Sequence, residues 1–226
     1  MMKISEMMSS NSCFLCGELP HHGGRIAIID NLQIVSDIAP LNPGHILLGS
    51  TKHVFSLSML TLDDLDRVEY LKEILRKILT KVYCQEPVLF EHGMGDACEL
   101  PACGIDHCHL HLIPVPGHDE FFGQTFFDFL HNLHIEVESV DLQSYRDLKC
   151  VEGKNYLFIE DLNGVKQALG TSHNFPAQVL RKYVATRLGS PYTYDWQLFF
   201  NQKKAQDTTR FLRNELQTTL KLSSFM

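Results

Sequence analysis

The sequence predicts an α+β fold in which an antiparallel sheet packs against one long helix. Two observations predict it: short apolar strands separated by turn residues, and a long amphipathic segment over residues 61–83. After about residue 118 the pattern changes, and the chain continues as an α/β elaboration. We therefore expect a core domain over 1–118. A C-terminal part over 119–226 either extends the same sheet or forms a small subdomain.

The strands of the core are bounded by turn-forming residues. Two strands are expected over 25–38, separated by the pair Asp30-Asn31, which favours a turn. Further strands bounded by Gly or Pro are expected at 45–50, 87–93 and 107–115. A loop rich in turn formers connects the last two of these strands.

The segment 61–83 is the strongest helix signal in the chain. Thr61 and Asp64 have the spacing of a capping box, which begins a helix. Apolar residues then recur at helical spacing and form one stripe: Leu65, Val68, Leu71, Leu75, Ile78 and Val82. This pattern is typical of a helix that packs on a core.

The C-terminal part contains weaker signals. The aromatic segment 121–134 fits a helix or a strand, and strands are expected at 135–140 and 155–160. A helix over 176–189 has Pro at its start and Gly at its end, and a final helix covers 203–222.

Composition excludes several classes of protein. The chain has 226 residues, 44% of them apolar and 21% charged, which is typical of a folded protein and not of a disordered one. The formal net charge is −7, so no basic excess exists to bind nucleic acid through its phosphates. No apolar run approaches the roughly 18 residues that a membrane span needs, and the N-terminal segment lacks a secretory apolar region. We expect a cytoplasmic protein with no nucleic-acid or membrane partner.

Seven Cys residues, an odd number, favour free thiols or metal ligands over a disulfide framework.

Three histidines alternate along the strand expected at 107–115. His107, His109 and His111 would share one face, and the residues between them would face the core. Packing alone favours Val or Thr at such positions. Two functional interpretations are open: a zinc site, or a nucleophilic histidine whose neighbours set its tautomer and contact an anionic substrate. A polar face without a function is the third.

Cys13 and Cys16 form a Cys-x2-Cys pair, which presents two thiolates as zinc prefers them. The pair needs two more ligands, and the candidates are His53 and His107. A redox motif is the alternative, but no βαβ pattern surrounds the pair.

The segment HCHLHLIP, residues 107–114, resembles the signature of the histidine triad family of nucleotide hydrolases and nucleotidyltransferases. The upstream segment IVSDIAPLNPGHILLGSTKHV is similar to the strand–loop–strand of the same family. The resemblance runs from about Cys13 to Val115 and implies the family's α+β fold. Residues 118–226 are similar to the tails of longer bacterial members.

The resemblance implies roles for individual residues. His109 matches the nucleophile, which attacks the α-phosphorus and forms a nucleotidyl-histidine intermediate. His111 matches the histidine that contacts the phosphate and assists the leaving group. Asp37 matches the acidic residue that holds the ribose hydroxyls, and Gly104 falls where a donor meets the phosphate.

In zinc-bearing branches of the family the first triad histidine is a metal ligand. Cys13, Cys16, His53 and His107 match those ligands, so the resemblance implies structural Zn²⁺. Two Cys and two His close a four-coordinate site, which is the pattern of structural zinc. Zinc on His107 would rigidify the strand that presents His109.

Glu91 departs from the family pattern, which has Asn or Gln facing the phosphate. A carboxylate beside a phosphate is repulsive unless it is protonated or turned away. We expect Glu91 at the nucleotide site, partnered by His92 or contacting the leaving group. Alternatively, Glu91 caps the backbone amides of the loop.

These observations predict an enzyme for hydrolysis or transfer at the α-phosphorus of a nucleotide conjugate. Candidate substrates are a dinucleoside polyphosphate, a nucleoside phosphoramidate and an adenylylated compound. The family resemblance also implies a homodimer. Two alternatives are a non-catalytic nucleotide-binding or regulatory protein, and a hydrolase with zinc on the triad itself. A sugar-phosphate uridylyltransferase is disfavoured because that branch has Pro at the position of Cys108.

Overall fold

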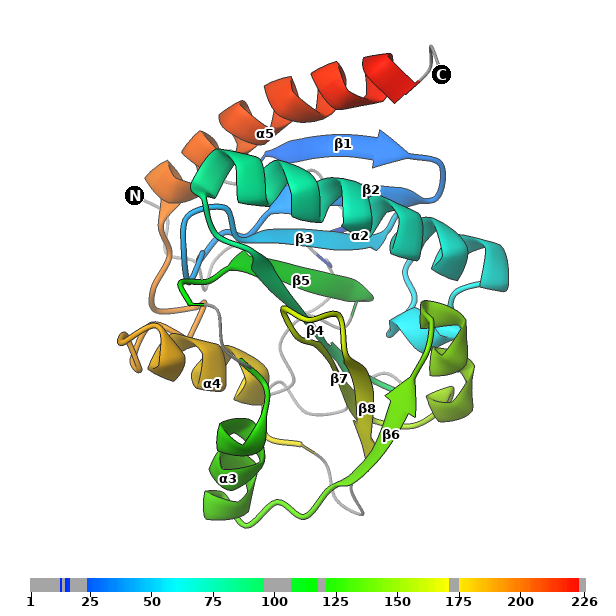
Figure 1. Cartoon of the computed structure of the whole chain (residues 1–226), viewed down its shortest axis with the longest axis vertical. Helices are drawn as coiled ribbons and strands as arrows, with labels where there is room; N and C mark the ends of the chain where they lie inside the picture. The colour runs from blue at the N-terminus through cyan, green and yellow to red at the C-terminus, as the bar shows by residue number, and fades with distance from the viewer. Residues whose placement is uncertain are drawn as a thin grey trace.

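One antiparallel sheet carries both parts of the chain (Figure 1). The computed structural model describes residues 13, 15–16, 24–95, 107–117, 121–170 and 175–223. Within these residues eight strands pair in the order β1-β2-β3-β5-β4-β7-β8-β6. The strands are β1 (Arg25–Ile29), β2 (Leu32–Ser36), β3 (Ile46–Ser50), β4 (Pro87–Gly93), β5 (His109–Pro114), β6 (Glu138–Leu142), β7 (Tyr156–Glu160) and β8 (Lys166–Gly170). The predicted α+β class is confirmed.

Helices cover both faces of the sheet. They are the 3₁₀ helices η1 (Leu57–Met59) and η3 (Tyr145–Val151) and the α-helices α2 (Leu62–Tyr83), α3 (Gln124–Asn132), α4 (Val179–Arg187) and α5 (Gln202–Ser223). Helices α2 and α5 lie side by side and share a core with the strands beneath them. Helices α3 and α4 pack in a second core, which contains residues of β4, β5, β7 and β8. The sheet is therefore the middle layer of three.

The C-terminal part continues the sheet of the core. Strand β7 pairs with β4, with Phe90 opposite Ile159 and Glu91 opposite Phe158. Of the two arrangements expected for this part, the structure shows the extension of the sheet. The boundary expected at residue 118 falls outside the described residues, and both cores contain side chains from either side of it.

Helix α2 forms as the sequence predicts. The Thr61 hydroxyl accepts a hydrogen bond from the Asp64 amide at 3.1 Å, which satisfies one free donor of the first turn. The predicted stripe is buried, except that Val82 is only partly buried and Leu79 is buried beside it. Each such Leu contributes about 1.5–3 kcal/mol through burial. Helix α2 also holds the C-terminal part, because buried Lys72 pairs with buried Glu160 at the end of β7.

The structure corrects several expected boundaries. The strand expected at 107–115 begins only at His109, and the strand expected at 135–140 lies at β6, two to three residues later. The aromatic segment 121–134 forms α3. Strand β8 and helix η3 were not expected. The sequence of β8, KQALG, has little alternation, and its pairing with β7 and β6 on both sides defines it as a strand.

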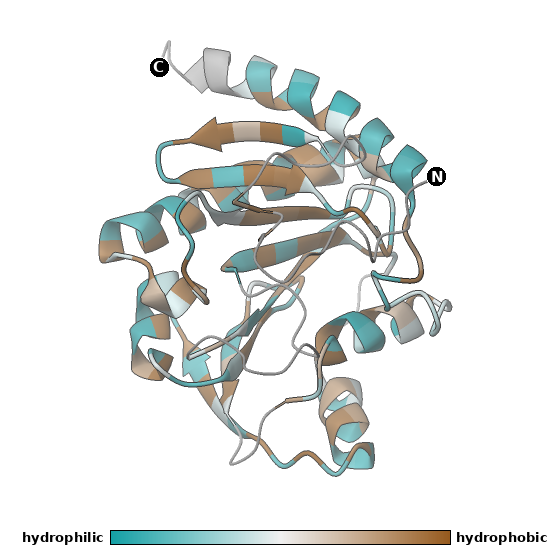
Figure 2. Cartoon of the chain, turned by 180° about the vertical axis from the view of Figure 1, so that it is seen from behind, coloured by the Kyte–Doolittle hydropathy of each residue, from teal (hydrophilic) through white to brown (hydrophobic). Residues whose placement is uncertain are grey.

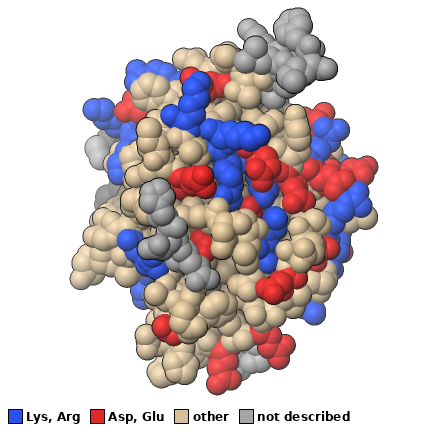
Figure 3. All heavy atoms as spheres, in the orientation of Figure 1, with Lys and Arg blue, Asp and Glu red and all other residues tan. Residues whose placement is uncertain are grey.

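Hydropathy follows this layered arrangement. Apolar residues gather along the strands, whereas α5 alternates between apolar and polar positions (Figure 2). On the face that carries α2, Lys and Arg are interspersed with Asp and Glu (Figure 3). Residues of α2 form ion pairs such as Arg67–Asp30 and Arg146–Asp66. That face therefore offers no single-sign patch for a polyanion. Among the described residues, no helix has both the length and the apolar character needed to cross a membrane.

Candidate active site

Strand β5 presents two histidines to the layer that contains α4. His109 lies opposite Gly49 of β3, and His111 lies opposite Leu47. The residues that alternate with the three histidines are buried in the core on the α2 side, as the alternation predicts: Cys108, Leu110 and Leu112. Gly49 is required at its position, because a Cβ there would lie 2.6 Å from the Cys108 carbonyl oxygen.

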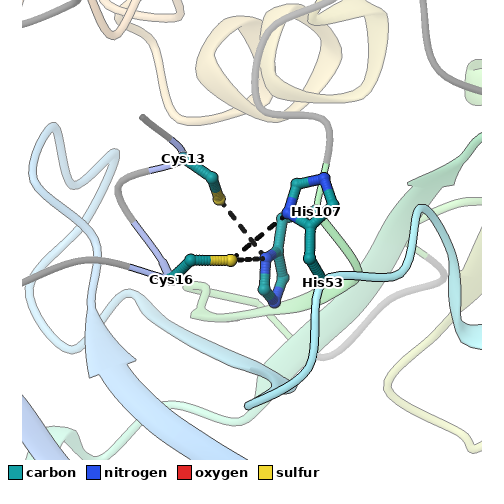
Figure 4. A group of neighbouring side chains, drawn as sticks. All are labelled: Cys13, Cys16, His53 and His107. Carbon is teal, nitrogen blue, oxygen red and sulfur yellow. Dashed lines mark hydrogen bonds between the residues drawn. The ribbon is translucent and has the colours of Figure 1, made fainter. Parts of the chain in front are cut away.

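His107 lies just before β5 and belongs to a different group of side chains. It meets Cys13, Cys16 and His53, whose donor atoms all lie within 4.8 Å of one another (Figure 4). The Cys13 Sγ is 3.3 Å from His107 Nδ1, and the Cys16 Sγ is 3.3 Å from the Nδ1 atoms of both His53 and His107. The structure thus brings together the four residues expected as metal ligands.

The segment that carries the two cysteines is anchored on the sheet. The Leu15 side chain is buried against Val35 and Leu47, and the Leu15 carbonyl accepts a hydrogen bond from Gln33 at 3.0 Å. The Cys16 amide donates to the Cys13 carbonyl at 3.1 Å, which closes the turn between them. Both thiols therefore point to the same place.

The donor set fits a zinc ion. His107 Nε2–H donates to the Ser50 carbonyl at 2.8 Å, so Nδ1 keeps its lone pair and faces the sulfurs. In a tetrahedral site with Zn–S and Zn–N bonds of about 2.3 and 2.0 Å, sulfur and nitrogen are about 3.5 Å apart. Burial and the neighbouring Cys13 raise the pKa of the Cys16 thiol to about 11, so two thiolates at this place need a cation.

His109 has the opposite tautomer. Its Nδ1–H donates to the His107 carbonyl at 2.5 Å, which leaves the Nε2 lone pair free. The ring is partly buried and lines a pocket between β5, β4 and α4. Burial lowers the pKa of His109, so the imidazole is neutral near pH 7.

His111 is held by a chain of hydrogen bonds. The Leu41 amide donates to His45 Nδ1 at 3.2 Å, so His45 carries its proton on Nε2. His45 Nε2–H then donates to His111 Nδ1 at 2.8 Å. His111 in turn carries its proton on Nε2, and its ring stacks on Phe90 at 4.4 Å between centroids. Burial lowers the pKa values of His45 and His111, which keeps both rings neutral.

Asp37 lies at the end of this chain. Its Oδ1 accepts from the Ala39 amide at 2.7 Å, and its Oδ2 accepts from Arg181 Nη1 at 2.8 Å. The Asp37 Oδ2 is also 3.4 Å from His45 Nε2 and 3.9 Å from His111 Nδ1. Asp37 lines the pocket but is only 4% exposed. A ribose would therefore share this carboxylate with protein donors.

Glu91 lies away from the pocket. Its neighbours Phe90 and His92 line the pocket, whereas Glu91 points to the other face of β4. There Glu91 accepts from the Leu57 amide at 2.8 Å and from the Tyr156 hydroxyl at 2.5 Å. This geometry corrects the expected nucleotide contact and the expected pairing with His92. The backbone amide that Glu91 caps is that of Leu57 in η1, whereas the alternative expected the loop after β4, most of which lies outside the described residues.

Helix α4 supplies the far wall of the pocket, which the sequence did not indicate. Residues 178–181 and Trp196 line it, so the C-terminal part completes the site. Gln178 has a positive φ of 58° and accepts from the Trp196 amide through its side chain. Pro at the start and Gly at the end of 176–189 predict a helix, but they do not indicate which structure its first turn faces. Gly104, expected to contact the phosphate, lies outside the described residues.

A second group of possible metal ligands, Asp37, His45 and His111, has its donor atoms within 4.8 Å of one another. The Arg181 guanidinium already pairs with Asp37, and the two histidines hydrogen bond to each other. A cation would have to displace all of these contacts. This arrangement disfavours a metal ion at these three residues, of which only His111 belongs to the triad.

Among known proteins, the chain resembles solved structures only. No protein-family model matches the sequence, and no curated protein is similar to it. Three solved structures that the chain resembles are a histidine triad nucleotide-binding protein from Sulfolobus tokodaii, a Zn-bound histidine triad family protein from Mycobacterium smegmatis and a yeast Ap4A phosphorylase. The first two are each 18% identical, with TM-scores of 0.36 and 0.34; the third is 13% identical, with a TM-score of 0.41.

The matches differ in extent. The match to the Sulfolobus protein covers 43% of this chain and 63% of that protein. The match to the Mycobacterium protein covers 42% of this chain and 67% of that protein. The match to the yeast enzyme covers 77% of this chain and 73% of that enzyme. The chain thus spans less than two thirds of the Sulfolobus protein. At these TM-scores the likeness carries no argument about activity. Two of these three solved structures are histidine triad proteins by name, and the third is an Ap4A phosphorylase.

Proposed function

We propose that this protein hydrolyses or transfers a nucleotidyl group at the α-phosphorus of a nucleotide conjugate, with His109 as nucleophile. One observation carries the proposal. His109 is a neutral imidazole whose Nδ1–H is bound to a backbone carbonyl and whose Nε2 lone pair is free at a pocket. Such an atom attacks phosphorus without a separate base.

In the first step the Nε2 lone pair of His109 forms a bond to the α-phosphorus. The bond from phosphorus to the leaving group breaks, and the leaving group takes the electron pair. The ring then carries a positive charge, which the His107 carbonyl stabilises through the Nδ1–H bond.

His111 acts on the leaving side. Its Nε2–H donates a hydrogen bond to the phosphoryl or leaving oxygen, where negative charge develops. In the second step a water or another acceptor attacks phosphorus, and the N–P bond breaks. A water loses one proton to solvent, and His109 returns to its neutral form.

Zinc is proposed as a structural ion held by Cys13, Cys16, His53 and His107. Four protein ligands leave no open position, so the ion would supply rigidity and no reaction step. It would join the N-terminal segment to the end of β3 and the start of β5. Asp37 is proposed as a ribose contact and Gly104 as a phosphate contact. The homodimer and the cytoplasmic location stay predictions.

The test is a quenched single turnover with a dinucleoside polyphosphate labelled at the α-phosphorus. We expect an acid-labile, base-stable nucleotidyl adduct, which mass spectrometry maps to His109. His131→Ala, at an exposed site on α3, is the control and should form the same adduct. Nucleotide binding with no adduct on any substrate class would favour the non-catalytic alternative. Rapid hydrolysis by His109→Ala would overturn the mechanism.

A further inference from the structure

Arg181 reaches the catalytic histidines from the C-terminal part of the chain. It lies in the first turn of α4, and the residue is only 6% exposed. A buried guanidinium needs a partner for its charge and for its donors. Asp37 at the pocket is the partner for the charge, and carbonyl oxygens of the protein are the partners for the remaining donors.

All three nitrogen atoms of Arg181 donate to protein oxygens. Nη1 donates to Asp37 Oδ2 at 2.8 Å, and Nη2 donates to the Ala39 carbonyl at 2.7 Å. Nε donates to the Tyr194 carbonyl at 2.9 Å. The planar fork is thus committed to the protein and is not free to hold a phosphate in the bidentate manner of arginine.

Asp37 lies between Arg181 and the two hydrogen-bonded histidines. Its Oδ2 is 2.8 Å from Arg181 Nη1, 3.4 Å from His45 Nε2 and 3.9 Å from His111 Nδ1. An unpaired carboxylate at these distances would favour the charged imidazolium form of both rings. The paired carboxylate does so far less, because the guanidinium charge opposes it.

We propose that Arg181 is a positioning residue: it holds Asp37 in an ion pair and thereby keeps His45 and His111 as a neutral pair with fixed tautomers. As a result, the Nε2–H of His111 stays directed to the pocket. That this N–H assists catalysis rests on the proposed function, whereas the tautomers of His45 and His111 do not depend on it. The C-terminal part would then set the protonation state of the site.

The groups that face the two rings come from every element around them. Asp37 follows β2, His109 lies on β5, His92 lies on β4 and Arg181 lies on α4. Among the described residues that line this pocket, Asp37 is the one acidic group, and its effect on the pKa of His111 opposes that of burial, His109 and Arg181. Removal of the Arg181 charge therefore has one expected direction, toward protonation of the pair.

The experiment is ¹⁵N NMR of histidine tautomers in the zinc-loaded protein between pH 5 and 8. In the parent protein His45 and His111 should both show the neutral Nε2–H form across this range. In Arg181→Met the apparent pKa of the pair should rise by about 1–3 units, and imidazolium signals should appear. Arg181→Lys keeps the charge and should stay close to the parent.

Two further variants make the result specific. Asp37→Asn combined with Arg181→Met removes both charges and should restore the neutral tautomers. Arg187→Met, on the same helix but bonded to Thr125, should change nothing at the pair. Unchanged tautomers and titration in Arg181→Met would overturn the proposal. If Arg181→Met fails to fold, the double variant and Arg181→Lys decide: the proposal fails if either shows a charged pair. These outcomes do not depend on turnover, so they are separate from failure of the proposed function.

Discussion

His107 and His109 are two residues apart in the sequence but belong to two different sites. His107 lies in the cysteine cluster, which is formed by Cys13, Cys16, His53 and His107, and His109 lies at the pocket; the two rings are held in opposite ways. At the cysteine cluster, His107 gives its Nε2–H to a carbonyl and turns Nδ1 to the sulfurs. At the pocket, His109 gives its Nδ1–H to a carbonyl and leaves Nε2 free. The backbone acceptor, and not the residue type, therefore decides which nitrogen of each ring is available.

The clusters also differ in their surroundings. Cys16 and His53 are exposed, and every member of the cysteine cluster comes from the first 107 residues. The pocket is more deeply buried and needs α4 (Val179–Arg187), which comes long after β5 (His109–Pro114) in the chain. Variants at the two clusters should therefore fail in different ways.

The largest effect should come from comparing His109→Ala with His107→Ala, because one variant should lose turnover and the other should lose zinc. His109→Ala should abolish adduct formation and turnover but keep about one zinc per chain, because the ring is not a ligand. His107→Ala should lose zinc and lower the melting temperature. Metal analysis, thermal melting and single-turnover assays on both variants measure this.

A double cysteine variant tests the zinc ligands independently of His107. Cys13→Ser with Cys16→Ser should bring zinc to near zero, as His107→Ala does, while Cys150→Ser at an exposed site keeps it. Full zinc content in the double variant would make the ligand assignment wrong.

His111→Ala tests the leaving side of the pocket. We expect the chemical step to slow by about 10²–10³-fold, since one positioned hydrogen-bond donor is removed at the reacting centre. Zinc content should not change. Rapid-quench kinetics measure the step, and a rate within a factor of two of the parent would exclude this role.

Glu91 provides a prediction about pH, because it belongs to neither cluster. Burial raises the pKa of Glu91 to about 8, above its unfolded value near 4.3. The folded state then binds the proton more tightly, so this contribution to stability is present below pH 4.3 and is lost as pH rises to about 8. Glu91→Gln should flatten that dependence, by up to about 5 kcal/mol between the two ends.

Urea unfolding at several pH values measures the effect of Glu91→Gln. Nucleotide affinity should stay within about twofold of the parent, because the carboxyl group lies on the other face of β4. A marked gain in affinity for simple nucleotides would instead place Glu91 at the phosphate.

The smallest effect should separate two roles of Asp37. If its carboxylate holds a ribose, Asp37→Asn should weaken ribonucleotides by about 1.5–3 kcal/mol and spare deoxyribonucleotides. If it serves only the ion pair with Arg181, both should weaken equally. Equilibrium binding of matched ribo and deoxyribo ligands distinguishes the two.

Much of this arrangement could be predicted from local pattern. The Thr61 cap, the stripe of α2 and the alternation around His109 depend on neighbours a few residues away. The meeting of Cys16, His53 and His107 was expected from the resemblance, which carries long-range information that spacing does not.

Other features depend on long-range pairing and could not be predicted. Whether Glu91 faces the pocket depends on the register of β4 against β5, and a shift of one residue reverses it. Arg181 follows from the docking of α4 on the sheet. The sequence of α4 shows a charged residue in a helix, which is more often a solvent-exposed position.

The pairing of β4 with β7 has a consequence for synthesis of the chain. Strand β4 has apolar, buried side chains on both faces, and β7 completes its hydrogen bonds. At roughly 5–20 residues per second, β7 leaves the ribosome several seconds after β4. Until then β4 is an open apolar edge, the kind of strand that associates with other chains. A nascent chain truncated before β7 should therefore aggregate, and a chaperone that covers such edges should raise the yield of the full-length protein.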